Sequence, residues 1–257
     1  MTPIEAVSVC VGYGDILRLV AHHNRPLLDR WVVVTAPGDS TTRQVCRECS
    51  IECLVTDEAK RDGPFSKGRL IDRGLAMLGG RGWLLHVDAD TALPCDTHQV
   101  LEEAYLDESC IYGCDRLNVI GEDAWARTSA GGLWSRNNPW LCNLAKPETS
   151  VGGRVANTGL GYTPIGFFQL WHGSASVWRE SHTRRYPRYD GTAAHTDVAH
   201  SLQWDVRKRI HLPSMVVYHF ETESAPMGAN WNGRKSRPAN LGVAIPQFSG
   251  RNSEVGY

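Results

Sequence analysis

Two carboxylates one residue apart, Asp88 and Asp90, are the residues of this chain best placed to do chemistry. They follow the apolar run Trp83–Val87, which is typical of a strand buried on both faces. Residues i and i+2 of an extended chain point the same way, so both carboxylates can converge on one point. Two anions this close repel each other unless a cation lies between them, and oxygen ligands suit Mg²⁺ or Mn²⁺. The spacing favours a divalent metal site; the alternative is that one Asp caps a helix and the other is solvated.

An alternation of strands and helices must position these aspartates. Strands are predicted at Ala6–Val11, Trp31–Thr35 and Cys53–Thr56, and helices at Ile16–His23, after a cap at Asp39 or Ser40, and at Leu70–Leu78. This order predicts an α/β fold, with a Rossmann-like, mostly parallel sheet flanked by helices. Ligands of such sheets bind outside the carboxyl ends of the strands, where we expect Asp88 and Asp90 to lie.

The sequence also disfavours several classes of nucleotide site and of protein. Neither a Gly-x-Gly-x-x-Gly motif nor a Gly-Lys-Ser/Thr phosphate loop follows the first strand, which argues against a dinucleotide cofactor or a phosphate loop. The 257 residues allow one large α/β domain or two small ones. No apolar run has the length of a membrane span, and no signal pattern opens the chain, so we expect a cytoplasmic protein.

Eight cysteines are expected to be reduced thiols in that compartment. Cys46, Cys49 and Cys53 have ligand-like spacing, and Cys110 and Cys114 would add two thiolates, so structural zinc is an alternative. Buried free cysteine is the more common outcome.

Charge is unevenly distributed along the chain. Residues 1–150 hold 15 Lys and Arg against 21 Asp and Glu, a net charge of −6, and residues 151–257 hold 12 against 7, a net charge of +5. The basic second part suggests an anionic partner, although scattered surface arginines would give the same count. After about residue 118 the sequence predicts long ordered loops, a helix-like run at Thr196–Lys208 and a strand at Met215–His219.

With these residues in view, the chain resembles the GT-A glycosyltransferases, which use nucleotide sugars, and most of all the short members encoded by bacteriophages. Val87-Asp88-Ala89-Asp90 resembles the Asp-x-Asp motif of that fold, and Phe65–Leu75 resembles the helix that precedes it. His219 corresponds to the later His that completes the metal site. The resemblance implies one GT-A domain, in which residues 1–118 bind the nucleotide sugar and residues 119–257 form a loop-rich acceptor half.

The resemblance also implies roles for individual residues. Asp90 and His219 would bind Mn²⁺ or Mg²⁺, with Asp88 completing the site at the ribose or at a metal-bound water. Asp197 would be the general base of an inverting transfer; the alternative is that Thr196 or Asp197 caps a helix. His86, two positions before Asp88, is a departure and not a role that the resemblance implies; it would support the site or be a buried core residue. The donor, expected to be a UDP-sugar, would contact Val11, Tyr13, Asp15, Thr35, Asp39, Lys67, Arg69 and Ala89.

The acceptor hypothesis is a hydroxymethylated pyrimidine in phage DNA. Arginines give bidentate phosphate contacts and an aromatic ring can stack on an extruded base. The residues expected to do so are Arg184, Arg185, Trp231 and Arg234. A saccharide or another small acceptor is the alternative, and no obligate protein partner is evident. A nucleotidyltransferase also uses paired aspartates on a similar sheet, whereas a non-catalytic binding module would need neither metal nor base.

Overall fold

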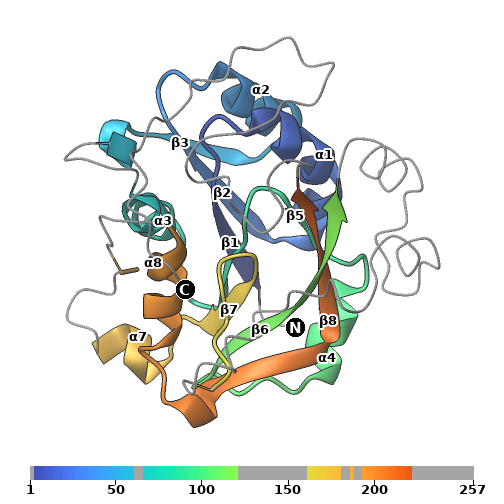
Figure 1. Cartoon of the computed structure of the whole chain (residues 1–257), viewed down its shortest axis with the longest axis vertical. Coiled ribbons are helices and arrows are strands. Elements are labelled where there is room, and N and C mark those ends of the chain that lie inside the picture. The colour runs from blue at the N-terminus through green and yellow to red at the C-terminus, as the bar shows by residue number, and fades with distance from the viewer. Residues whose placement is uncertain (1–2, 61–65, 121–160, 181–185, 188–192, 222–257) are drawn as a thin grey trace.

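The computed structural model describes residues 3–60, 66–120, 161–180, 186–187 and 193–221. Within these ranges the chain forms one eight-stranded sheet in the order β3-β2-β1-β4-β7-β6-β8-β5, with helices on both sides (Figure 1). Four of its seven strand pairings are parallel. The predicted α/β fold with a mostly parallel, Rossmann-like sheet is confirmed.

The first half of the sheet is parallel because a helix joins each strand to the next. Its strands are β1 (Ile4–Val9), β2 (Arg30–Thr35), β3 (Glu52–Val55) and β4 (Trp83–His86). Its helices are α1 (Gly14–Asn24), α2 (Ser40–Glu48) and α3 (Lys67–Leu75). The sequence predicted all seven elements, although β1 and α3 begin two and three residues earlier than expected.

Alternate residues of the central strands pack into two cores, one on each face of the sheet. Ala6 and Val33 pack with α1 and α2 on one face. Val7, Val32 and Val34 pack with α3 on the other face, together with Trp171 and Trp204 from the second half of the chain. Such two-sided burial explains why these strands read as continuous apolar runs.

One glycine sets how closely α3 approaches the sheet. A Cβ at Gly74 would lie 2.3 Å from Val7 Cγ2 and 2.9 Å from Val34 Cγ2, so only glycine allows this contact. Because α3 carries Lys67 at its first position, this packing also fixes where that lysine enters the site.

The second half of the sheet mixes strand directions. β7 (Gln169–His172) is antiparallel to both β4 and β6 (Ile111–Ile120). β6 runs parallel to β8 (Arg209–Glu221), with a bulge between Cys114 and Asp115. β5 (Thr91–Ala92) pairs with β8 and is the edge strand on this side of the described sheet. The remaining elements of the described residues are α4 (Thr97–Glu103), α7 (Ser176–Glu180), α8 (Ala193–Ser201) and the 3₁₀ turns η1 (Arg25–Leu27), η2 (Asp57–Lys60) and η5 (Val206–Lys208).

The sequence prediction was weaker in this half. The helix expected over Thr196–Lys208 ends at Ser201, and a separate turn follows, in which the Asp205 side chain accepts a hydrogen bond from Arg207 N. The division expected between residues 118 and 119 stays a prediction, and β6 runs through it. Among the described residues, no helix combines the length and the apolar character needed to cross a bilayer.

Candidate active site

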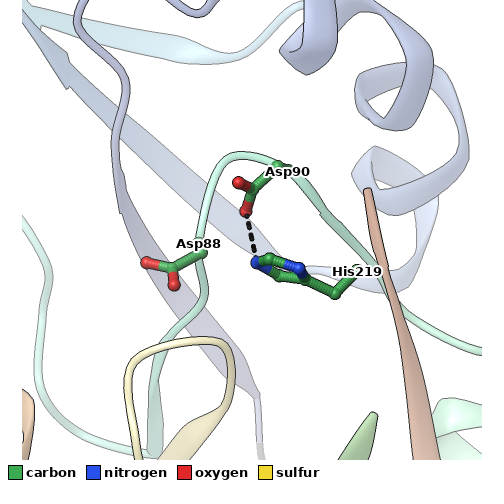
Figure 2. Close-up of side chains that lie close together, drawn as sticks. All are labelled: Asp88, Asp90 and His219. Carbon is green, nitrogen blue, oxygen red and sulfur yellow. Dashed lines mark ion pairs between the residues drawn. The ribbon is translucent and has the colours of Figure 1, made fainter. Parts of the chain in front are cut away.

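The two aspartates of the central motif meet a histidine from the far end of the chain. Asp88 and Asp90 lie in the turn after β4, and His219 lies on β8, opposite Thr91 of β5. One ligand atom of each residue lies within 4.8 Å of the others (Figure 2). In the described part of the chain, this is the only group of three or more potential ligands found so close together.

The turn that carries the aspartates is held on both sides by hydrogen bonds. Thr91 N donates to Asp88 O at 3.1 Å and Phe220 N donates to Asp90 O at 2.9 Å. The buried Asn24 side chain of α1 donates to Thr91 O at 2.8 Å and accepts from Leu93 N at 2.9 Å. The metal motif is therefore braced by α1 and β8 at once.

Electrostatics favour a cation at this cluster. Asp90 Oδ1 is buried, accepts no hydrogen bond and lies 3.4 Å from His219 Nε2. Burial raises the pKa of Asp90; His219 opposes this shift and Asp88 adds to it. A buried carboxylate oxygen beside an imidazole and a second carboxylate is a donor set that suits Mn²⁺ or Mg²⁺. The residues present therefore fit a divalent metal ion.

Lys67 connects this cluster to the predicted base. Its Nζ donates to Asp88 Oδ1 at 2.8 Å and to Asp197 Oδ2 at 3.1 Å. Burial acts to lower the pKa of Lys67, but Asp197 and Asp88 outweigh it and raise that pKa above its usual range. Burial alone would raise the pKa of Asp88. Lys67 and His86 outweigh burial and lower that pKa to about 2. Lys67 and Asp88 are therefore both charged at neutral pH.

Asp197 lies inside α8, and the helix-cap alternative is wrong because α8 begins at Ala193. The residue is 7% exposed. Its Oδ1 accepts from the Tyr186 hydroxyl at 2.9 Å, while its Oδ2 faces Lys67. A Cβ on Gly166 would lie 2.1 Å from Asp197 Oδ2, so the backbone of residue 166 packs directly on this ion pair.

Several of the residues predicted for the nucleotide lie at the carboxyl ends of β1 and β2. Asp39 Oδ2 accepts from Gly12 N at 2.7 Å and from Thr35 Oγ1 at 3.1 Å, and Asp39 also caps α2 through Thr42 N. Asp39 thus connects the loop after β1 to the loop after β2, and its carboxylate is hydrogen-bonded to protein groups. Of the other predicted donor residues, Val11 and Tyr13 follow β1, Asp15 lies in the first turn of α1, Ala89 lies between the aspartates, and Lys67 and Arg69 lie on α3.

Sequence reasoning missed two residues of this site and left a third open. Gln169 and Tyr186 lie behind Asp197, and His86 is fully buried beside them. Burial, and then Lys67, lowers the pKa of His86. Its position two residues before Asp88 was the one sequence signal for this group. The acceptor residues Arg184, Arg185, Trp231 and Arg234 lie outside the described residues.

The cysteines do not form a metal centre in the described part of the chain. The free thiols include Cys46, Cys49 and Cys110, all buried. Cys46 and Cys53 contact each other, and this contact with burial raises the pKa of the Cys46 thiol. Because no group of three cysteines comes together among these residues, the zinc alternative has no support from the described structure.

Comparison with known proteins gives a likeness of fold. No family model matches the chain, and no curated protein matches it. The solved structures that resemble it include a mycobacterial protein, with 16% identity and a TM-score of 0.44 over 86% of this chain and 66% of that one. They also include glucosyl-3-phosphoglycerate synthase from M. tuberculosis (14% identity, TM-score 0.48, 85% of this chain and 71% of that one). The same synthase with Mn²⁺, uridine diphosphate and phosphoglyceric acid gives 14% identity and a TM-score of 0.49, over 85% of this chain and 70% of that one. The chain thus spans about two thirds of the length of these proteins. At such identities and TM-scores a common function has to be argued from the site itself.

Proposed function

We propose that this protein is a metal-dependent glycosyltransferase that moves a sugar from a UDP-sugar to an acceptor hydroxyl, with inversion at the anomeric carbon. One observation carries the proposal. Asp88, Asp90 and His219 form a ligand set near the carboxyl end of β4, with Asp90 and His219 buried and Asp88 half-buried, and Lys67 links that set to Asp197. Paired carboxylates at this edge of an α/β sheet suit a diphosphate and its metal ion.

The donor side of the site follows from the first two loops and the metal ligands. Asp90 and His219 would hold Mn²⁺ or Mg²⁺, with Asp88 beside them at the ribose or at a metal-bound water. Such a cation, when bound, offsets the negative charge that grows on the leaving diphosphate. Tyr13 would stack on the uracil, and Asp39 would support this pocket by fixing the Gly12 backbone.

The acceptor side centres on Asp197. This carboxylate would take the proton from the acceptor hydroxyl as the oxygen attacks the anomeric carbon. Lys67 holds one of its oxygens and Tyr186 the other, so the carboxylate is fixed before any substrate arrives. Lys67 thereby acts on the base and on Asp88 together, rather than as a free phosphate ligand.

The acceptor itself is proposed to be a hydroxymethylated pyrimidine in phage DNA, modified in the host cytoplasm. The net charge of +5 over residues 151–257 and the arginines and tryptophan of the acceptor set support this choice. Because phosphate contacts release counterions, log K falls as log salt rises, with a slope of about −0.9 for each phosphate neutralised on duplex DNA. Binding to modified duplex should weaken accordingly between low and physiological salt, and no binding at low salt would leave a saccharide or other small acceptor.

The experiment for the reaction class is product analysis. The protein is incubated with a panel of UDP-sugars and Mn²⁺, with and without hydroxymethylated DNA, and released UDP and pyrophosphate are both measured. We expect the wild-type protein to release UDP, and EDTA to abolish this release. The Asp90→Asn variant should release no UDP, whereas Asp57→Asn, on an exposed turn, should release it as the wild type does. Pyrophosphate release would identify a nucleotidyltransferase instead, and metal-independent turnover would contradict the proposal.

A further inference from the structure

A buried tyrosine hydroxyl lies directly behind the proposed base. Tyr186 is fully buried, and its hydroxyl is 2.9 Å from Asp197 Oδ1, 3.2 Å from His86 Nδ1 and in contact with Gln169 Oε1. We propose that Tyr186 is a positioning residue for Asp197, which holds the carboxylate in the orientation needed to accept a proton. The inference rests on the proposed function and adds to it a group that sequence reasoning did not assign.

The surrounding hydrogen bonds fix which way Gln169 points. Its Nε2 has three acceptors within hydrogen-bond distance, Asp197 O at 2.9 Å, Pro164 O at 3.0 Å and Ser201 Oγ at 2.8 Å, which share its two hydrogens. Ser201 Oγ in turn donates to Pro164 O, so its own hydrogen is already used. The amide nitrogen of Gln169 therefore faces these acceptors, and its oxygen faces Tyr186 and His86.

This orientation determines the donors on the other side. Gln169 Oε1 only accepts, so the His86 Nδ1 at 3.2 Å from it must carry the imidazole hydrogen. Tyr186 then has one hydrogen and two oxygen acceptors, Gln169 Oε1 and Asp197 Oδ1. A carboxylate oxygen is a stronger acceptor than an amide oxygen, so the Tyr186 hydroxyl donates to Asp197 Oδ1.

The backbone of Tyr186 is anchored as firmly as its hydroxyl. Its N–H donates to Asp72 Oδ1 of α3 at 2.5 Å. A Cβ on Gly68 would lie 2.0 Å from Pro187 O, so this segment packs directly on α3. The Tyr186 ring stacks on His200 of α8, with ring centroids 4.2 Å apart. The hydroxyl is therefore held at a fixed point relative to both helices that carry the site.

For the reaction, the consequence is that the Asp197 carboxylate is hydrogen-bonded at both of its oxygens. Lys67 holds Oδ2 and Tyr186 holds Oδ1, so both oxygens restrain the rotation of the group, and each keeps a lone pair for a further donor. In the transfer step the acceptor O–H bond breaks, the proton moves to Asp197 and the freed oxygen bonds the anomeric carbon as UDP leaves. Tyr186 keeps its own hydrogen throughout. Once Asp197 is neutral, that hydrogen can turn to Gln169 Oε1, which it already contacts.

The test removes only the hydroxyl. Tyr186→Phe keeps the ring contacts with His86 and His200. We expect kcat for UDP release to fall by roughly tenfold to 10²-fold, as for other displaced catalytic groups. The KM for the UDP-sugar and the affinity for UDP with Mn²⁺ should stay within about twofold, because positioning acts on the chemical step. Tyr112→Phe is the matched control: Tyr112 is a buried tyrosine away from the site, whose hydroxyl accepts a hydrogen bond from Asp107 N, and removal of that hydroxyl should lower the melting temperature without changing kcat.

A double-mutant cycle separates positioning from a general structural role. In the Asp197→Asn background, Tyr186→Phe should change the residual kcat by less than about twofold, because the residue acts through Asp197. Wild-type kcat in Tyr186→Phe, or an equal loss in both backgrounds, would overturn the inference. Absence of UDP release from the wild-type protein would instead refute the proposed function, so the two failures are distinguishable.

Discussion

At the scale of single residues, the site depends on how Asp197 is held. Its two oxygens face Lys67 and Tyr186, and Asp88 shares the same lysine. A carboxylate bound on both oxygens loses little orientation freedom when the substrate binds, which is how a fixed base gains rate. Replacing the Asp197 carboxylate by an amide and shifting the carboxylate from its position should therefore both lower turnover.

Removing the base chemistry is the first prediction. Asp197→Asn should lower turnover by about 10²–10⁴-fold, the usual contribution of a general base. UDP binding with Mn²⁺ should be retained, because Asn can still bond Lys67 and Tyr186. Steady-state kinetics and calorimetry measure the two effects. Equal turnover in Asn and Asp proteins would leave Asp197 with a structural role only.

Displacing the base is the second prediction. In Gly166→Ala the new Cβ would lie 2.1 Å from Asp197 Oδ2 and 2.6 Å from Lys67 Nζ. Both atoms are ends of side chains, so the fold should survive while the ion pair moves. We expect turnover to fall by about 10²-fold with little change in melting temperature. Gly79→Ala, whose new Cβ would meet only Glu5 at 3.3 Å, is the control and should keep full turnover.

At the scale of elements, α1 braces the metal motif although it supplies no ligand. Asn24, its last residue, makes two hydrogen bonds across Thr91 and Leu93, just after Asp90. The side chain thus takes the place of a neighbouring strand for this part of the turn. The conformation of the metal motif should depend on it.

Loss of that brace is the third prediction. Asn24→Ala leaves Thr91 O and Leu93 N without these partners, which should cost about 1–3 kcal/mol for each buried group that stays unsatisfied. It should also weaken Mn²⁺ binding, because Asp90 lies in the loosened turn. Urea unfolding and Mn²⁺ titration test both effects. His22→Ala, on the exposed side of the same helix, should leave both unchanged, and wild-type Mn²⁺ affinity in Asn24→Ala would disprove the bracing role.

The helices and strands differ in how well the sequence predicted them. The parallel half followed from apolar runs ended by Gly, Pro and Asp, and Asp88, Asp90 and His219 came together as expected. β6 and β7 were missed because their partners are far away in sequence, so no local period marks them. The same reason hid Tyr186 and Gln169, whose roles depend on contacts with α8 and β4 that only the folded chain makes.

At the scale of the whole molecule, buried histidines link stability to pH. His200 is enclosed by the rings of Trp171, Trp178, Tyr186 and Trp204. Burial, with a smaller effect from His86, lowers its pKa well below the ordinary 6.5. The unfolded chain therefore binds this proton at a higher pH than the folded chain does. The corresponding stability is present above pH 6.5 and is lost as the pH falls below it.

The fourth prediction follows from that sign. Between about pH 6 and pH 5, the free energy of unfolding should fall by up to about 1.4 kcal/mol per pH unit for the His200 proton. His200→Phe, which keeps the ring packing, should reduce this slope, whereas His22→Phe on the surface should not. Denaturant unfolding at several pH values gives the slopes. Identical slopes in wild type and His200→Phe would show that His200 is protonated equally in both states.

The central claim is that Asp88, Asp90 and His219 form a metal site that binds the diphosphate of the donor. Titration of UDP into the wild-type protein, with Mn²⁺ and then with EDTA, tests it most directly. We expect heat of binding only with Mn²⁺, and none for Asp90→Ala under either condition, while its melting curve shows a folded protein. UDP binding of equal strength in EDTA, or in Asp90→Ala, would contradict the claim.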